Sequence, residues 1–222
     1  MDVLDIDTLV LAHGSHNSRD EAVCVMEAVA WFANEPHSDH PQCASKVLTA
    51  FLMSLNDAWD DEHRQTLKQY IPRVVGTNTG AADDARRAWM CTDWLVRTYT
   101  PAWLRLAGLN AQAELLTSLP ELVGADECTA IKPTLIAVRD DASAAWSAAW
   151  SAAESAAWSA AESAAWSAAE SAAESAAWSA AESAARSAAR SAAESALSPV
   201  VDELQPTIHD LIERMLAVGK AE

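Results

Sequence analysis

A four-residue repeat constrains this chain more than any other feature of its sequence. From Ser143 to Ala196 the chain reads Ser-Ala-Ala-X without interruption. The run contains no Pro, Gly or β-branched residue, and half of it is Ala, the residue with the highest helix propensity. As a helix it would be about 80 Å long, whereas a compact domain of this size is about 35 Å across. We therefore expect the helix to project, bend, break or be covered by another chain.

The fourth position of the repeat carries Trp, Glu or Arg. Four residues turn a helix by about 400°, so this position drifts by about 40° per repeat and forms no single stripe. The small Ser and Ala side chains allow a second helix to approach closely, and the indoles would fill the remaining space. Three interpretations remain open: an expanded spacer, an assembly helix, or a tryptophan ladder that binds a ligand or surface. The predicted interaction residues are Trp146, Trp150, Trp158, Trp166 and Trp178.

The chain is strongly acidic, with a formal net charge of −17 and a sequence pI of about 4.6. Residues 1–62 contain twelve acidic and two basic residues. Nucleic-acid binding needs a basic surface, and a basic membrane-surface helix is absent, so we expect neither partner. An acidic surface instead suits solubility, a basic protein partner or mimicry of nucleic acid.

The cysteines and the N-terminal residues indicate a cytoplasmic protein. The four cysteines are widely spaced and form no Cys-x-x-Cys pair, which is typical of reduced thiols. Acidic residues occupy the place of the cationic start of a signal peptide. No run of 18 uncharged apolar residues predicts a transmembrane helix.

The pattern before the repeat predicts an all-α fold, because no segment alternates as strands do. We expect a helical N-terminal domain over 1–128, a long Ala-rich helix over 129–197 that begins near Thr129 or Pro133, and a C-terminal amphipathic helix within 198–222 after a break at Ser198-Pro199. The predicted shorter helices are 19–34, capped by Ser18 with Glu21, then 41–57, 60–75 with a kink or end at Pro72, 81–98, one opening at Pro101, and one within 108–124.

The densest group of polar residues lies between Glu35 and Cys43, where two His, one Asp and one Cys fall within seven residues. Zinc takes these side chains as ligands, and His13, His16, Cys24 and His63 are further donors in the chain. The alternatives are a proton-transfer site, or a loop in which Ser38 and Asp39 cap the next helix. No cofactor is expected, and zinc is kept only as an alternative. The candidate metal ligands are His37, Asp39, His40 and Cys43.

Glu27 lies inside the most apolar predicted helix. A buried carboxylate must be paired, or its pKa is raised. Arg87, Arg97 or Arg105 would make a structural pair. Alternatively, Glu27 is a ligand or general base beside His37 or His40. Glu27, His37 and His40 are therefore the candidate catalytic residues.

Two motifs carry a resemblance to a known group of proteins. The segments 24–31 (CVMEAVAW) and 34–43 (NEPHSDHPQC), with further likeness at 51–57, 71–72, 93–97 and 101–104, resemble a family of uncharacterised proteins of actinobacteria and their phages. The family also has an Ala-rich helical tail. The resemblance implies an intracellular actinobacterial or phage setting and no known activity.

Three functions follow from these observations. The first is a protein-interaction module that self-assembles into a homo-oligomer through the Trp-bearing helix. The alternative is a metal-dependent or acid–base enzyme that uses the His37–Cys43 loop. The second alternative is a phage-encoded acidic decoy that binds a basic host protein. The sequence has no P-loop, GxGxxG, GxSxG or HExxH motif, so nucleotide-binding and common hydrolase functions lack support.

Overall fold

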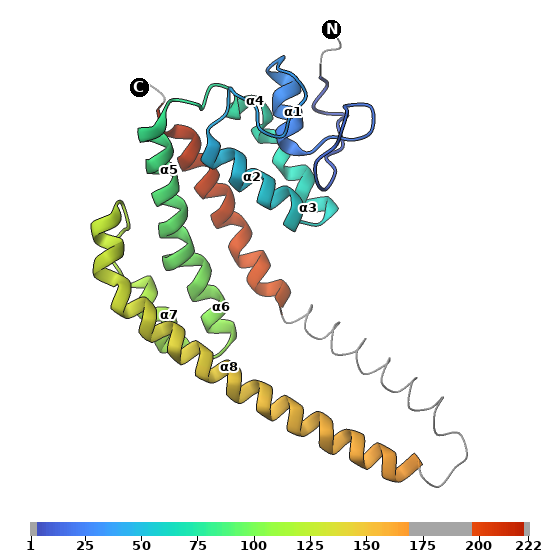
Figure 1. Ribbon diagram of the computed structural model, residues 1–222, viewed down its shortest axis with the longest axis vertical. Coiled ribbons are helices and arrows are strands. Elements are labelled where there is room, and N and C mark those ends of the chain that lie inside the picture. Colours follow the sequence, from blue (N-terminus) through green and yellow to red (C-terminus); the bar gives the residue numbers. More distant parts are fainter. Residues whose placement is uncertain (1–3, 169–196, 220–222) are drawn as a thin grey trace. The chain divides into compact units, whose positions relative to one another are not determined.

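The computed structural model describes residues 4–168 and 197–219, with the backbone alone at residues 146 and 148–168. Helices dominate these residues, which confirms the all-α prediction (Figure 1). Among the described residues, the β-type pairing consists of one parallel bridge between Leu11 and Val23. In chain order the helical elements are α1 (Val25–Phe32), α2 (Lys46–Ala58), α3 (Asp61–Gln65), the 3₁₀-helix η1 (Thr66–Tyr70), α4 (Ile71–Val74), α5 (Ala81–Trp94), the π-helix η2 (Leu95–Tyr99), α6 (Thr100–Leu106), α7 (Asn110–Thr117) and α8 (Ala125–Ala168), followed by a helix that includes residues 197–217.

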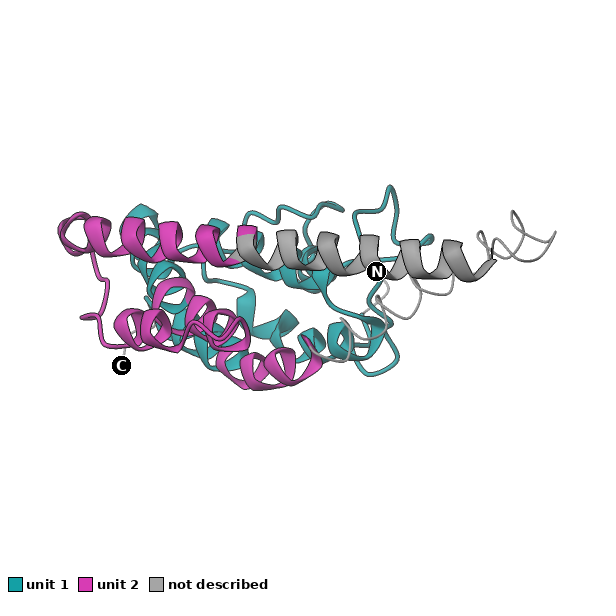
Figure 2. Ribbon diagram, turned by 90° about the horizontal axis from the view of Figure 1, so that it is seen from below, with its two compact units in different colours: residues 1–94, 208–222 teal, residues 95–207 magenta. Residues whose placement is uncertain are grey.

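Two compact units divide the chain, one comprising residues 1–94 with 208–222 and the other residues 95–207 (Figure 2). This division differs from the predicted domains 1–128, 129–197 and 198–222. The end of the C-terminal helix joins unit 1 because its apolar side chains are buried there. The buried residues of this end are Ile208, Leu211, Ile212, Met215 and Leu216.

The centre of unit 1 is α1, which is apolar on nearly all sides, as predicted. It packs against α2 and α4, and a helix buried on all sides needs such neighbours around it. The buried apolar side chains of these three helices are Val25, Met26, Ala28, Val29, Ala30, Leu48, Leu52, Leu55, Ile71 and Val74.

The predicted start of the first helix is wrong. α1 begins at Val25 with Cys24 as its N-cap, rather than after Ser18. Val23 is held extended by its bridge to Leu11, with Ala12 N donating to Val23 O at 2.9 Å, so the helix cannot begin earlier. Glu21, the expected capping-box partner of Ser18, accepts instead from Asn17 N.

The predicted helix from Pro41 also begins later, at Lys46. Ser45 is its N-cap and accepts from Leu48 N at 3.3 Å. Ser38, expected to cap this helix, accepts instead from His40 N within the loop. The span 60–75 is divided among α3, η1 and α4, with Pro72 in the first turn of α4, where its missing N–H has no helical partner to lose.

Unit 2 begins where α5 passes into η2 and α6. Pro101 cannot donate the backbone N–H that an α-helix requires, and the π-helix immediately precedes α6. The described core of the unit joins α6, α7 and the first part of α8 through Leu104, Ala113, Leu116 and Val138.

The long helix starts at Ala125, earlier than the predicted Thr129 or Pro133, with acidic side chains in its first turn that favour a helix N-terminus. It ends in the description at Ala168, so the backbone of the first part of the repeat is helical. The rest of the repeat, 169–196, lies outside the described residues. Ser198 and Pro199, predicted to break the helix, are both helical.

Side-chain bonds fasten the C-terminal helix to unit 1. Arg87 is fully buried and donates to the carbonyl oxygens of Met215 (3.1 Å) and Val218 (2.8 Å), and it pairs with Asp84 at 3.1 Å. These carbonyls are at the end of the helix, where no intrahelical donor remains for them. The Arg87 guanidinium therefore completes the helix end.

Tyr70 and His209 form a second fastening, with Tyr70 Oη 2.6 Å from His209 Nδ1. Burial lowers the pKa of His209 and raises that of Tyr70 to about 12, so both rings are held neutral at neutral pH. Arg73 and Glu213 form a two-bond ion pair on the same pair of elements.

We expect Arg87→Met to destabilise unit 1 by about 3–5 kcal/mol, because it leaves the two carbonyls and Asp84 without their buried cation. Arg86→Met is the matched control, since Arg86 is exposed and lies 3.7 Å from Asp83; it should change stability by less than about 0.5 kcal/mol. Urea unfolding of the full chain measures both. Equal losses in the two variants would contradict the assignment.

Candidate functional site

The site is built around Glu27, a carboxylate that is 1% exposed at the start of α1. Its Oε2 atom accepts from Cys24 N at 2.7 Å, and Glu27 N lies 3.5 Å from Cys24 Sγ, so the two residues form a capping box. Its Oε1 atom accepts from His16 N at 2.6 Å. The carboxylate therefore caps the central helix and holds the preceding loop.

Two histidines surround this carboxylate. His16 Nδ1 lies 2.9 Å from Glu27 Oε2. His37 Nε2 lies 2.8 Å from the carbonyl oxygen of His16 and 3.6 Å from Glu27 Oε1. Because a carbonyl oxygen can only accept, Nε2 of His37 carries the hydrogen. Among the described residues, the buried Nδ1 atom of His37 has no hydrogen-bond partner.

The structure thus places Glu27 beside His37, one of the two alternatives from the sequence, whereas the recorded charged neighbour of His40 is Asp39. The expected arginine partner is wrong. Arg87 pairs with Asp84, while Arg97 donates to Leu119 O and Arg105 lies near Glu114 within unit 2. A histidine contributes both a ring nitrogen and a backbone N–H to the carboxylate, and this double contact with His16 has no signature in the sequence.

Hydrogen bonds set the charge of the site. Burial alone would raise the pKa of Glu27, but donation from His16 N, Cys24 N and the His16 ring lowers it below its ordinary range. Burial, together with the nearby Glu27 carboxylate, raises the pKa of Cys24 to about 12. Glu27 is therefore an anion, and Cys24 is a neutral thiol rather than a nucleophilic thiolate.

The loop before α1 is held by further side chains from α2. Asp57 Oδ1 accepts from Gly14 N at 2.9 Å, and Asn56 Nδ2 donates to Ala12 O at 2.9 Å. Gly14 has a φ of +81°, a conformation that favours glycine. A small cavity of about 80 Å³ lies here, lined by Gly14, Ser15, Cys24, Asp39, Met53, Asn56 and Asp57.

The four predicted zinc ligands do not form one group, although two of them, Asp39 and His40, are neighbours. His40 is 70% exposed and its Nε2 lies 3.9 Å from Asp39 Oδ1. Cys43 is near Glu35, whose carboxylate accepts from the backbone N–H of Gln42 and Cys43, and burial raises the pKa of Cys43 to about 11. Within the parts of the chain that the structure describes, no three His, Cys, Asp or Glu side chains are grouped to hold a metal ion. The zinc site gains no support and stays a prediction.

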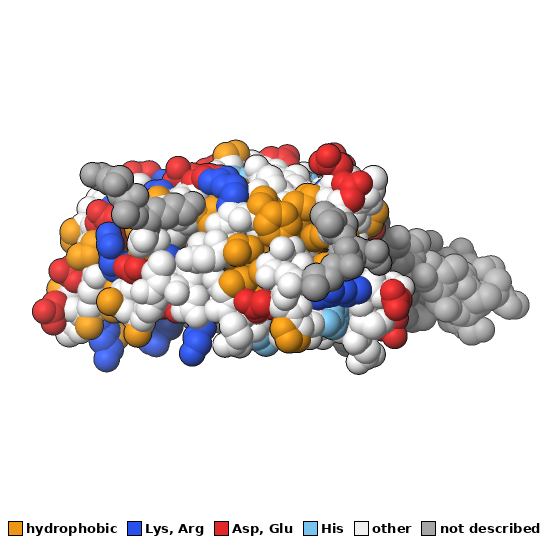
Figure 3. Space-filling view, turned by 90° about the horizontal axis from the view of Figure 1, so that it is seen from above, with side chains coloured by type: hydrophobic (Ala, Val, Ile, Leu, Met, Phe, Trp, Pro, Cys, Tyr) orange, Lys and Arg blue, Asp and Glu red, His pale blue; other side chains and the backbone are white. Residues whose placement is uncertain are grey.

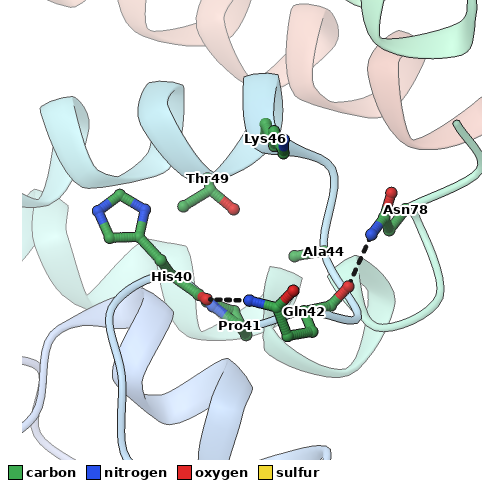
Figure 4. Close-up of a pocket in the computed structure, with 7 residues that line it drawn as sticks. All are labelled: His40, Pro41, Gln42, Ala44, Lys46, Thr49 and Asn78. Atoms are coloured by element: carbon green, nitrogen blue, oxygen red, sulfur yellow. Dashed lines mark hydrogen bonds between the residues drawn. The ribbon is translucent and has the colours of Figure 1, made fainter. Parts of the chain in front are cut away.

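His40 belongs to a different feature, a depression of about 310 Å³ between the 40–42 segment, the first turn of α2 and Asn78 (Figure 4). Gln42 bridges this loop, with Asn78 Nδ2 donating to its carbonyl oxygen at 2.8 Å. The side chains of His40, Lys46 and Thr49 line the depression.

The charge of the surface and the length of the helices do not identify a partner. On the face drawn in Figure 3, basic side chains are interspersed with acidic ones. Among the described helices, none combines the length and apolar character needed to cross a bilayer. A basic protein partner stays a prediction. The side chains of Trp146, Trp150, Trp158 and Trp166 and the whole of Trp178 lie outside the described residues.

Comparison with known proteins gives no match to a family model, to a curated protein or to a solved structure. The resemblance carried by segments 24–31 and 34–43 therefore stays a prediction.

We expect Glu27→Gln to lower stability at pH 7 by about 2 kcal/mol, the scale of hydrogen bonds to a charged group. The pKa of Glu27 is lower in the folded chain than in the unfolded chain. The stabilisation by its charge is therefore complete above about pH 4.3, the ordinary pKa of Glu. This stabilisation is lost as the pH falls through the lowered pKa of the folded chain. The difference between wild type and variant should therefore shrink in acid, as measured by urea unfolding across pH.

Glu21→Gln is the control for this prediction, because Glu21 is exposed and accepts a single long bond of 3.3 Å from Asn17 N. It should leave both the stability and its pH dependence nearly unchanged. A pH-independent loss in Glu27→Gln would show that the carboxylate charge does not stabilise the site.

Proposed function

We propose that this chain is a self-assembly module in which the repeat helix of one copy packs against that of a second copy. The observation that carries the proposal is the continuity of α8 from Ala125 to Ala168, which makes the first part of the repeat a helix. At 44 residues, this helix is about 66 Å long.

The described core of unit 2 uses the part of α8 that precedes the repeat. Leu135, Val138 and Ala142 contribute to this core, and the first Ser-Ala-Ala-X unit begins at the next residue. About 39 Å of helix follows, by the standard rise. Helices in water gain most of their stability from packing, which favours a partner for this length.

The repeat itself supplies the chemistry for a like partner. Two of every three residues between the X positions are Ala, and the third is Ser, so two backbones can approach closely. Each buried indole removes roughly 150–250 Å² from water. A second copy presents the same small residues and the same indoles, which is the self-complementarity that a symmetric interface needs.

The helix after the repeat adds apolar surface. Leu197 and Val201 are 40% and 42% exposed at its first described turns. These two side chains lie one helical turn apart and therefore share one face of the helix.

We expect the untagged full chain to sediment as a dimer or larger oligomer at tens of micromolar. Replacing the five repeat tryptophans with Ala should convert it to a monomer, because the indoles supply most of the buried apolar area. Replacing Glu154, Glu162, Glu170, Glu174 and Glu182 with Ala is the matched control and should preserve assembly. A monomeric wild-type chain would overturn the proposal and favour the spacer interpretation.

A second candidate function is acid–base chemistry at His16. Its support is the pairing of His16 Nδ1 with the buried Glu27 carboxylate, which orients the ring and leaves Nε2 for proton transfer, the arrangement used in carboxylate–histidine catalytic pairs. This candidate replaces His40 with His16 as the partner of Glu27.

Hydrolysis of p-nitrophenyl acetate by the full chain tests this candidate. We expect His16→Gln to lower the rate by roughly 10²-fold, the lower end of general acid–base effects. His63→Gln is the control, because His63 pairs with Asp60 at 2.7 Å at the protein surface and should retain the wild-type rate. Equal rates in both variants at matched helical content would eliminate the candidate.

A further inference from the structure

The depression beside His40 has the size and lining of a small ligand site. Its volume of about 310 Å³ is at the lower end of the roughly 300–1,000 Å³ typical of ligand pockets. Pro41, Ala44 and Thr49 are buried and form its inner lining. The polar side chains around them belong to His40, Gln42, Lys46 and Asn78 (Figure 4).

Thr49 places a polar side chain in the inner lining of the depression. It is 3% exposed, and its side chain lines the space drawn in Figure 4. Thr92 and Thr117 occupy helices too, and each hydroxyl donates to the carbonyl oxygen four residues earlier. Among the described residues, no partner is found for the Thr49 hydroxyl. Because Thr49 lines the depression, its hydroxyl can donate to a ligand atom there.

Charge gives the chemistry of the ligand. Lys46 has no ion-pair partner among the described residues, and His40 is largely exposed. Both face a depression at the first turn of α2, where the helix dipole favours negative charge. Two carboxylates are close: Asp39 lies 3.9 Å from His40, and Asp84 lies 3.4 Å from the backbone nitrogen of Lys46. Asp84 is itself paired with Arg87 at 3.1 Å.

From this juxtaposition we propose that the depression between His40, Lys46 and Thr49 binds a small molecule that carries an anionic oxygen group on a compact apolar body. Lys46 supplies the charge, Thr49 donates a hydrogen bond from the floor, and Pro41 and Ala44 contact the apolar part. This site is independent of self-assembly and of the Glu27 cluster, since neither Glu27 nor the repeat contributes to its lining.

Titration of the isotope-labelled full chain with phenyl phosphate and with benzoate tests the proposal by NMR. We expect saturable shifts of the backbone amides of Lys46, Thr49 and Asn78 with both anions, and none with the neutral benzyl alcohol. The relative affinities of the two anions distinguish a phosphate from a carboxylate ligand. The absence of a saturable shift with either anion would overturn the proposal.

Two variants test which side chains contribute to the affinity for the anion. Lys46→Gln should weaken binding by about tenfold, which corresponds to about 1.4 kcal/mol, and Thr49→Val, which keeps the shape of the side chain, should weaken it several-fold. Lys132→Gln is the matched control, because Lys132 is an exposed lysine of α8 and its loss changes the net charge equally. An equal loss of affinity in the control would show that net charge alone attracts the anion, and would refute a built site.

Discussion

The Glu27 carboxylate connects the start of α1 to the loop that precedes it, through hydrogen bonds that an apolar side chain could not make. It caps α1 through Cys24 N, and it binds the preceding loop through two nitrogens of His16. An isolated ionised carboxylate would not stay buried, because desolvation is costly. Burial of the carboxylate in α1 therefore depends on the donors that the loop supplies. The same bonds that make Glu27 a candidate acid–base group thus have a structural role, and only a rate measurement separates the two.

Parts of this fold could be predicted from the sequence, because they depend on local pattern. The apolar surface of α1 and the loop between Gly76 and Gly80 are of this kind. Helix starts were missed where a distant residue decides them. Val23 is extended because it pairs with Leu11, and Ser45 caps α2 while its hydroxyl bonds Asp84, 39 residues later. Ser18 and Pro41 have the right local chemistry for a helix start, yet tertiary contacts override it.

The candidate site shows the same limit. Burial of Glu27 in an apolar helix could be predicted from the sequence, whereas its neighbour was left open between His37, His40 and an arginine. The identity of its closest partner could not, since His16 reaches it through backbone and ring together. Likewise, the clustered His and Cys residues between His37 and Cys43 suggest one site, but the loop sends them to different neighbours. His37 packs against His16, and Cys43 packs near Glu35. Side chains that are close in sequence can therefore have different neighbours when they lie in a loop.

The two interpretations of the repeat differ in what they demand of its register. Insertion of one Ser-Ala-Ala-X unit after Ala142 advances a helix by about 6 Å and rotates every later X position by about 40°. Relative to Leu135 and Val138, which fix the start of α8 in the core of unit 2, each following tryptophan would then face a new direction. A spacer is indifferent to this rotation, because Ser and Ala occupy the same positions after the insertion. An interface between two copies is not, because its indoles must meet the same small residues on the partner. Sensitivity of the oligomeric state to the number of repeats is therefore the property that an assembly helix has and a spacer lacks.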